Sequence, residues 1–341
     1  MECKQIIFPE VNKAALADKK LPAVGPKSVV VRTVVSTISP GTERANITGD
    51  PNVNAIGPSP KFPRSSGYNV AGIVTEVGSE VKSVKVGDRV AVYWSKHQTI
   101  NIVDENNVVK IEDDRVSFEA AAMSFIASFS MAAIRKTRVE IGESAMVMGV
   151  GLLGLLAVKL LKAAGAVPVI AVDPNPARRE MALANGADYA FDPFEEGFAA
   201  NVKKITNGGV NAVIEVTGVG GGFNGALDCM AKFGRIALLG CTRSSDFTVD
   251  YYHKIHAPGI TVIGAHTLAR PEKESSSGWF THRDDIKSIL KLCAAGRLEL
   301  DNIVGETHTP DECAEVYDRL VNDKNFPIAV QFDWRNFETD K

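Results

Sequence analysis

The segment 144–165, SAMVMGVGLLGLLAVKLLKAAG, constrains the fold of this chain more than any other. Its glycines Gly149, Gly151 and Gly154 have the spacing G-x-G-x-x-G, with an apolar run on either side. Between a strand and a helix, the first glycine allows a tight turn, the second lets backbone approach a pyrophosphate, and the third permits close helix packing. The phosphates would lie at the positive end of the helix dipole. The segment therefore predicts a dinucleotide-binding unit; the alternative is a turn that binds nothing.

Runs of strand and helix character alternate around this motif. Helical segments lie at 152–165 and 175–186, between the first three of six runs with strand character. These runs are 144–149, 167–173, 189–192, 211–218, 234–240 and 259–264. Such alternation predicts an α/β fold with a doubly wound parallel sheet. Residues 28–109 contain short valine-rich runs between glycines and prolines, which predict strands without helices. The C-terminal part adds helices over 282–296 and 310–323 and strands around Ile303 and over 328–332.

Composition excludes several classes of function. The formal net charge is only -3 and the basic residues are scattered, so we expect neither a nucleic-acid partner nor membrane binding. The N-terminus, MECKQIIFPE, lacks the basic start and apolar run of a signal peptide, which predicts a cytoplasmic protein. The apolar run 120–134 contains serines and is shorter than a membrane span of about 20 residues, so it indicates a buried helix. The cysteines are far apart, without a C-x-x-C pair, as is typical of reduced thiols.

Asp173 bears on the choice of cofactor, because it ends the second strand of the dinucleotide-binding unit. A carboxylate there accepts hydrogen bonds from both adenosine ribose hydroxyls of NAD. It would repel the 2'-phosphate of NADP by about 1 to 4 kcal/mol per charge at an effective dielectric constant of about 20 or more. NAD is therefore predicted over NADP. Arg178 and Arg179 oppose this choice, because a guanidinium can bind a phosphate as well as cover an adenine ring. Asp173 could also cap the following helix.

The whole chain resembles the medium-chain dehydrogenase/reductase superfamily, the zinc-type alcohol dehydrogenase-like proteins. The resemblance rests on VGSEVKSVKVGDRV at 77–90, on VMGVGLLG followed by VD, and on GRLELDNIVGETHTPDECAEVYDRL at 296–320. It implies a GroES-like β-barrel catalytic domain, 1–124 and 268–341, and a Rossmann dinucleotide-binding domain, 125–267. Two motifs, ISPGTERANITG at 38–49 and GYNVAGIVTEVG at 67–78, resemble most closely the bacteriochlorophyllide a dehydrogenase-like (BchC-like) branch.

The zinc ligands of the superfamily are replaced in this chain. Position by position, the resemblance puts the zinc-binding Cys on Pro40, the His and Glu on Tyr68 and Asn69, and the remaining ligand near Ser124. Proline has no ligand atom, and neutral hydroxyl and amide groups are poor zinc ligands. The four-cysteine lobe of the structural zinc is also missing from residues 93–114. We therefore expect no zinc, so that another group must polarise the substrate oxygen.

Four residues are candidates for the proton transfer that accompanies hydride transfer. Tyr68, in the metal position, is the first, because a phenol can donate a proton to a carbonyl; alternatively it fills the space left by zinc. Thr42 falls where the resemblance implies a hydroxyl relay. Glu43 falls on an adjacent acid, or else forms an ion pair with Arg44 or another base. His97 resembles a histidine of the branch, and imidazole is a side chain suited to proton transfer, although a lone histidine is more often structural.

The resemblance also implies which residues contact the cofactor. Residues 264–267, GAHT, correspond to the segment beside the nicotinamide carboxamide, and Trp94 is expected to form pocket wall. The complete set of expected cofactor contacts is Ser128, Gly149, Gly151, Leu152, Leu153, Gly154, Asp173, Arg178, Thr217, Gly240, Cys241, Ala265 and His266.

Together these features predict a zinc-independent, NAD(H)-dependent oxidoreductase acting on an alcohol, polyol, sugar or ketone. One alternative is a quinone or enone reductase, since zinc-free relatives reduce activated alkenes. Another is a catalytically silent nucleotide-binding sensor. The expected partner is a small-molecule substrate, and the resemblance implies a homo-oligomer, either a dimer or a tetramer. No motif identifies the substrate itself, because pocket specificity is spread over scattered side chains.

Overall fold

The computed structural model describes residues 2–54 and 57–337, which belong to two compact units. The first unit comprises residues 1–126 and 286–341, and the second comprises 127–285. The second boundary therefore lies at 285, whereas the sequence prediction puts it at 267. Residues up to Asp285 belong to the second unit because Arg270 forms an ion pair with Asp285 at 3.2 Å and donates to the Ser128 carbonyl at 2.9 Å.

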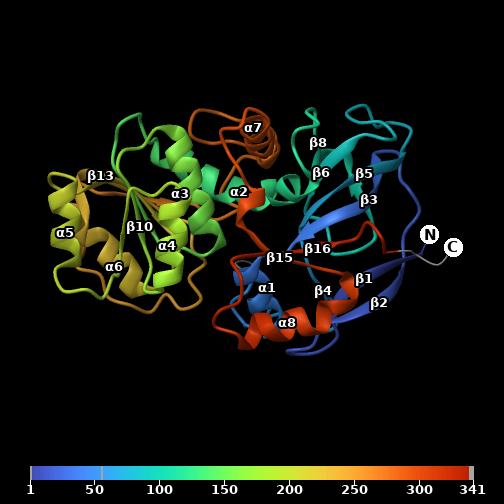
Figure 1. The fold of residues 1–341 in the computed structure, drawn as a ribbon, viewed down its shortest axis with the longest axis horizontal. Coiled ribbons are helices and arrows are strands. Elements are labelled where there is room, and N and C mark those ends of the chain that lie inside the picture. Colours follow the sequence, from blue (N-terminus) through green and yellow to red (C-terminus); the bar gives the residue numbers. More distant parts are fainter. Residues whose placement is uncertain (1, 55–56, 338–341) are drawn as a thin grey trace. The chain divides into compact units, whose positions relative to one another are not determined.

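Two sheets form the first unit. In the larger one the strand order is β15-β16-β3-β5-β6-β8, with β7 also paired to β3; the smaller has the order β2-β1-β4. The strands are β1 Glu2–Phe8, β2 Ala15–Lys20, β3 Ser28–Thr37, β4 Arg64–Ser65, β5 Asn69–Val77, β6 Arg89–Tyr93, β7 Ile100–Asp104, β8 Val108–Lys110, β15 Val304–His308 and β16 Ala329–Asp333. Helices α1 Pro40–Ile47 and α8 Cys313–Asn322 contact each other, and Figure 1 shows α8 beside β2.

Strand β3 organises the larger sheet. Its valines are buried on both faces, which explains why its sequence is a continuous apolar run rather than an alternating one. β5 pairs with one edge of β3, and β7 and β16 share the other, β7 along residues 28–32 and β16 along 35–37. The C-terminal strand β16 thus completes a sheet that begins near the N-terminus.

The second unit contains a six-stranded sheet in which every pairing is parallel. The strand order is β11-β10-β9-β12-β13-β14, the order of a doubly wound sheet that reverses between β9 and β12. Its strands are β9 Ala145–Met148, β10 Val169–Val172, β11 Tyr189–Phe191, β12 Val210–Glu215, β13 Met230–Leu238 and β14 Thr261–Gly264. Its helices are α3 Leu152–Ala164, α4 Pro176–Ala184, α5 Phe198–Ile205 and α6 Gly220–Asp228, seen around the strands in Figure 1. The predicted parallel sheet is confirmed.

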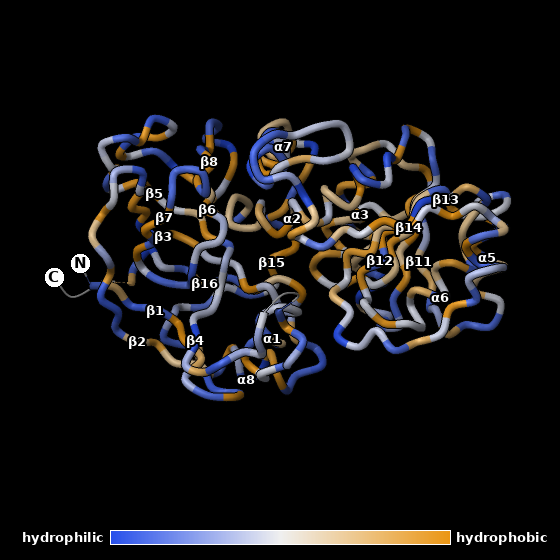
Figure 2. The backbone as a smooth tube through the Cα atoms, turned by 180° about the vertical axis from the view of Figure 1, so that it is seen from behind, coloured by the Kyte–Doolittle hydropathy of each residue, from blue (hydrophilic) through white to orange (hydrophobic). Residues whose placement is uncertain are grey.

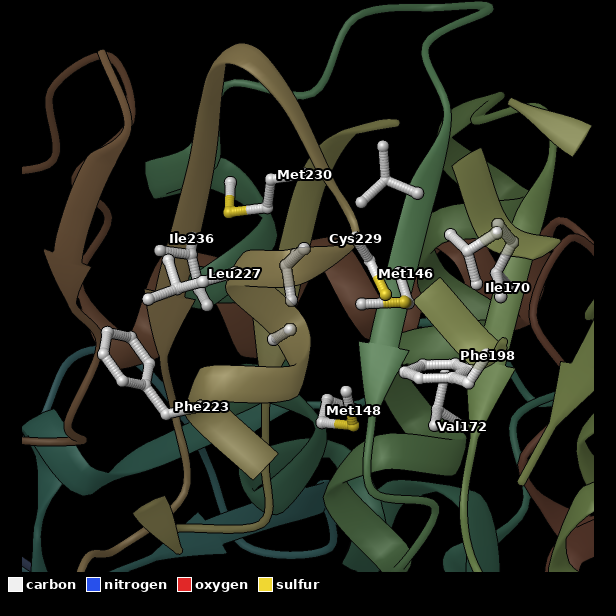
Figure 3. Packing of buried hydrophobic residues seen from close by; sticks show 14 of the residues in the cluster. Met146, Met148, Ile170, Val172, Phe198, Phe223, Leu227, Cys229, Met230 and Ile236 are labelled. Carbon is white, nitrogen blue, oxygen red and sulfur yellow. The ribbon is translucent and has the colours of Figure 1, made fainter. Parts of the chain in front are cut away.

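A continuous apolar core supports this sheet. The strands are largely hydrophobic in Figure 2, while hydrophilic colours concentrate in the loops. Figure 3 shows Met146 and Met148 of β9 pointing to the same side as Ile170 and Val172 of β10, with Phe198 of α5 over them. Alternate residues of neighbouring strands therefore build one layer of side chains under the helices.

Helix α2, Phe118–Thr137, carries the apolar run of the sequence. Within the described part of the chain it is the one helix long and apolar enough to cross a membrane by length and composition. Of its most apolar window, 83% is buried inside the protein. A helix that is apolar all round and buried is typical of a protein core. Helix α7, His282–Ala294, contains the second boundary, between Asp285 and Ile286.

Candidate active site

The glycine-rich turn of the second unit has the geometry of a phosphate cradle. Gly149 has φ +97°, and a Cβ atom there would lie 2.9 Å from Thr217 Cγ2. A Cβ atom on Gly154 would lie 1.9 Å from the Gly149 carbonyl oxygen, so only glycine allows the helix to start this close to the strand. At Gly151, by contrast, a Cβ atom would meet nothing within 4 Å. The cradle is thus closed towards the protein and open where a pyrophosphate would approach the N-terminus of α3.

Asp173 is positioned by backbone groups on both sides of the cradle. It follows β10, is 4% exposed, and its carboxylate accepts from the Val150 amide at 2.8 Å and from the Asn175 amide at 2.9 Å. The cap of α4 is formed by Asn175, whose side chain accepts from the Ala177 amide at 2.9 Å. Asp173 therefore anchors the glycine-rich turn, and its remaining lone pairs suit the ribose hydroxyls of NAD.

The two arginines that follow Asp173 have different roles. The Arg179 guanidinium donates to the carbonyls of Asp173 and Pro174 at 2.7 and 2.9 Å and forms an ion pair with Asp192 at 3.2 Å. Arg178 instead forms an ion pair with the Asp173 carboxylate, with its Nη1 atom 3.7 Å from Asp173 Oδ2. Arg179 thus stabilises the turn after β10. Arg178 lies beside the carboxylate that is expected to bind the ribose.

The other predicted cofactor residues of the sheet gather at its carboxyl edge. Thr217 follows β12, Gly240 and Cys241 follow β13, and Ala265 and His266 follow β14. Ligands of open parallel sheets bind at this edge, next to the point where the strand order reverses. Burial lowers the pKa of His266, and the charges of nearby Arg243 and Lys136 lower it further. His266 is therefore neutral at physiological pH.

The remaining predicted cofactor residues belong to helices. Leu152 is buried in the first turn of α3, and the adjacent Leu153 accepts from the Ser130 hydroxyl at 2.7 Å through its carbonyl. Ser128 is fully buried in α2. The hydrogen bond between Ser130 and Leu153 thus joins α2 to the first turn of α3.

The first unit contains its own cavity of about 140 Å³. Its walls come from three segments, residues 42–46, 64–68 and 94–96. Thr42, Glu43 and Tyr68 of the predicted catalytic set lie on these walls, whereas His97 does not. The same cavity is lined by Arg64 and Lys96, which the sequence analysis did not single out. No sequence motif marks these two cations, because they are 32 residues apart (96 − 64), with Arg64 in strand β4 and Lys96 in the loop between β6 and β7.

The hydroxyl of Tyr68 lies at the N-terminus of helix α1. The phenol donates to the Ser39 hydroxyl at 2.5 Å, and Ser39 is the N-cap of α1. Its ring packs against Phe125 and Trp94, with centroid distances of 5.7 and 6.2 Å. Trp94 therefore forms pocket wall, as predicted, and Tyr68 has both an aromatic packing role and a hydroxyl beside a second hydroxyl.

The residues at the superfamily's zinc positions have side chains that are poor zinc ligands. Pro40 is the first residue of α1. Asn69 is buried in β5, with its amide nitrogen 3.4 Å from the Thr37 carbonyl, and the Ser124 hydroxyl donates to the Ala121 carbonyl at 2.6 Å in its own helix. Within residues 2–54 and 57–337, no cluster of three or more His, Cys, Asp or Glu side chains could hold a metal ion. These donors do not fit zinc, which prefers thiolate, imidazole and carboxylate.

Glu43 and His97 belong to one buried network. His97 is fully buried, with Nε2 3.1 Å from Glu43 Oε2 and Nδ1 2.7 Å from the Ser36 hydroxyl. Glu43 also accepts from the Ser66 hydroxyl at 2.6 Å and from the Tyr317 hydroxyl at 2.5 Å. The partner of Glu43 is thus His97, whereas Arg44 donates to the Val321 carbonyl at 2.9 Å. These contacts favour the structural alternatives for Glu43 and His97.

Ionisation of this network is asymmetric. Burial alone would raise the pKa of Glu43, but His97 and the hydroxyls of Ser66 and Tyr317 outweigh it, so the pKa lies below its usual value. Burial and the Glu43 charge raise the pKa of Tyr317 well above its usual value. Glu43 is therefore a carboxylate and Tyr317 a neutral donor. Tyr317 belongs to α8, 274 residues from Glu43, so sequence proximity could not have revealed it.

Gly67 explains why the chain can pass so close to His97. It has φ +87°, and a Cβ atom there would lie 2.5 Å from His97 Cδ2 and 2.7 Å from the His97 amide nitrogen. Because the amide belongs to backbone, a side chain at position 67 would displace the loop that carries His97. Glycine at this position therefore aims Tyr68 into the cavity while His97 stays buried behind it.

Comparisons with known proteins agree with the two units. Family models match as an alcohol dehydrogenase GroES-like domain over residues 25–124 and as a zinc-binding dehydrogenase over residues 153–280. The L-threonine 3-dehydrogenase of Pyrococcus horikoshii is 28% identical over 319 residues, 85% of this chain and 87% of the relative. The D-guloside 3-dehydrogenase of Escherichia coli is 26% identical over 271 residues, 78% of this chain and 77% of the relative.

A solved structure shares the fold. The crystal structure of 2R,3R-butanediol dehydrogenase from Bacillus subtilis matches with a TM-score of 0.82 at 22% identity, covering 97% of this chain and 99% of that one. The predicted architecture, a GroES-like domain with a Rossmann-type domain, is thereby confirmed.

Proposed function

We propose, from the premise that this chain belongs to the zinc-type alcohol dehydrogenase-like medium-chain superfamily, that it transfers a hydride between NAD(H) and an alcohol, polyol, sugar or ketone without catalytic zinc. It is a dehydrogenase-type oxidoreductase. Relatives named as threonine and guloside dehydrogenases support a polar, hydroxylated small molecule as substrate. The S-x-G-T-E and G-Y motifs support membership of the BchC-like branch, and superfamily resemblance supports a homo-oligomer.

The observation that carries the proposal is the Tyr68 hydroxyl on the wall of the cavity, where the superfamily has a zinc-binding histidine. The glycine-rich turn and Asp173 would hold NADH, which would supply a hydride for the substrate carbonyl carbon when bound. In that direction Tyr68 donates its proton to the carbonyl oxygen, and the Ser39 hydroxyl, 2.5 Å away, then donates to the phenolate that remains. In the reverse direction the phenolate takes the proton of the substrate hydroxyl. Thr42 lies on the same wall and suits a relay.

The test of this function is a screen of alcohols, sugars, ketones, quinones and enones with NAD(H), in the presence and absence of a chelator. We expect turnover of an alcohol or ketone that a chelator leaves unchanged, and less than a tenth of an equivalent of zinc per chain by elemental analysis. About one zinc per chain with chelator-sensitive turnover would contradict the zinc-free proposal. Turnover confined to quinones or enones would favour the reductase alternative, and tight NADH binding without any turnover would favour a sensor.

A second prediction concerns cofactor choice. Asp173→Ser removes the carboxylate that suits the ribose hydroxyls and would repel a 2'-phosphate. We expect NADH to bind about 10-fold more weakly and the preference for NADH over NADPH to shrink by at least 10-fold, measured by fluorescence titration of both cofactors. Glu180→Ser, an exposed side chain on α4, is the matched control. Equal affinity of the wild type for NADH and NADPH would contradict this role of Asp173.

A further inference from the structure

Arg64 is a half-buried cation, and no salt bridge to it is found among the residues that the structure describes. It lies on β4, whose backbone pairs with β1 at Phe8, and its side chain lines the cavity of the first unit. Its Nε and Nη1 atoms are inaccessible to solvent and have no hydrogen-bond acceptor among the residues that the structure describes. Burial lowers the pKa of this guanidinium. Because a guanidinium stays charged, such an arrangement is costly unless a ligand supplies the acceptor.

Lys96 brings a second positive charge to the same cavity. Its backbone is fixed by Asn101, which accepts from the Lys96 amide at 2.9 Å and donates to the Lys96 carbonyl at 3.2 Å. Burial lowers the pKa of Lys96, nearby Lys19 and Arg64 lower it further, and Glu43 opposes them. In the described part of the chain the ammonium group has no hydrogen-bonded acid. Two basic side chains therefore line one small cavity.

Glu43, the one acid among the described residues that line the cavity, already forms hydrogen bonds to other groups of the protein. Its Oε1 accepts from the Ser39 amide at 2.8 Å and lies 3.2 Å from His97 Nε2, and its Oε2 accepts from the hydroxyls of Ser66 and Tyr317. Both carboxylate oxygens of Glu43 are thus already hydrogen-bonded, and the charge acts on Lys96 only through space. With one acid and two bases among the lining residues, the formal charge of the wall is +1 (2 − 1).

We propose that Arg64 and Lys96 form a carboxylate subsite, so that the substrate is a hydroxy acid or the corresponding keto acid. This inference rests on the proposed function, which gives the cavity to the substrate. A single carboxylate balances a wall of charge +1, and the planar guanidinium matches its two oxygens. The cavity of about 140 Å³ is large enough for a carboxylate and its neighbouring carbons. The neutral donors on the same wall, including Thr42 and Ser65, complete the hydrogen bonding.

Binding of simple probes tests the subsite without any turnover. We expect acetate and glycolate to raise the melting temperature of the full chain in a saturable way, while ethylene glycol and equal concentrations of sodium chloride do not. Arg64→Met should weaken glycolate binding by about 10- to 100-fold, and Lys96→Met by about 10-fold. Lys61→Met, which removes an exposed lysine outside the cavity, is the matched control and should bind glycolate like the wild type. Stronger binding of phosphate than of glycolate would overturn the carboxylate assignment.

Stability of the empty protein provides a second readout. Because the Nε and Nη1 atoms of Arg64 are buried without an acceptor, Arg64→Met should leave the melting temperature in the absence of anions unchanged or raise it. A lowered melting temperature would show that Arg64 has a structural partner, and would overturn the subsite. Arg64→Lys, which keeps the charge but loses the planar fork, should retain part of the glycolate affinity. The two variants thus separate the effect of the positive charge from the effect of the planar guanidinium.

Turnover of matched substrates separates this inference from the proposed function. Lactate and 3-hydroxybutyrate are compared with 2-propanol and 2-butanol, in which a methyl group replaces the carboxylate. We expect the acids to have kcat/KM at least 100-fold higher, and Arg64→Met to remove that preference mainly through KM. Turnover of the neutral alcohols alone would overturn the subsite and leave the function standing. Binding of glycolate that depends on Arg64, without turnover of any compound, would support the subsite and overturn the function.

Discussion

Tyr68→Phe is expected to lower kcat by about 10² to 10⁴ while leaving NADH affinity and the fold intact. The substitution keeps the ring that packs against Phe125 and Trp94, but it removes the hydroxyl that lies 2.5 Å from Ser39. General acid–base groups typically contribute that range of rate. Single-turnover kinetics should show the loss in the hydride-transfer step, together with a changed pH dependence of kcat.

A matched control and a clear contrary outcome make this experiment decisive. Tyr252→Phe removes an exposed phenol of the Rossmann-type domain and should keep normal turnover. If Tyr68 only packs in place of a metal, Tyr68→Phe would lose no more than a few fold in kcat, and its cost would appear as a lower melting temperature, since Ser39 loses a hydrogen-bond donor. That result would remove Tyr68 from the proposed mechanism and leave Thr42 as the cavity hydroxyl to test.

Glu43→Ala should lower the free energy of unfolding by about 3 to 5 kcal/mol, because it leaves several buried donors without an acceptor. Those donors are the Ser66 and Tyr317 hydroxyls, the Ser39 amide and the His97 ring, and Glu43 is only 2% exposed. Glu43→Gln should lower the free energy of unfolding by nearly as much, because its amide nitrogen is a hydrogen-bond donor placed against other donors. Urea unfolding measures both, with the exposed Glu80→Ala as control.

The pH dependence of stability gives an independent check on Glu43. Its pKa in the folded protein lies below the ordinary value of 4.5. The carboxylate therefore contributes its full stability above about pH 4.5, and this contribution is lost as the pH falls through the lower folded-state pKa. Between these values the wild type should lose stability with acidification, and Glu43→Ala should show a shallower loss. Parallel curves for the two proteins would contradict a buried, ionised Glu43.

The parallel sheet could be predicted because its signals are local. The spacing of Gly149, Gly151 and Gly154 fixes strand, turn and helix within 20 residues, and buried parallel strands are continuous apolar runs. Strands β3, β5, β6 and β7 were similarly visible as valine-rich runs. The short helix α1 was not, because it has few apolar residues and starts at a proline, and the strand signals of β1 and β2 are interrupted by charged residues.

The cavity could be predicted only in part, since long-range contacts determine its chemistry. Alignment to a superfamily motif was enough to select Tyr68, Thr42 and Glu43. The structural partners of Glu43 come from β3's end, the 64–68 segment, the 94–99 loop and α8, so no spacing rule could reveal them. Arg64 and Lys96 are two of many basic residues in the sequence. Only burial without an acid distinguishes them, and burial is a property of the fold.

The position of strand β16 has a consequence for the order in which the two units can fold during synthesis. Its residues 331–333 pair with residues 35–37 of β3, and Tyr317 reaches Glu43 from the same C-terminal region. The second unit, by contrast, is one continuous stretch, residues 127–285. On the ribosome, the second unit can therefore fold before strand β16, which the first unit needs, has been made. Until residues 331–333 have been made, residues 35–37 of β3 lack their partner strand, so this part of the β3 edge is open to mispairing during that interval.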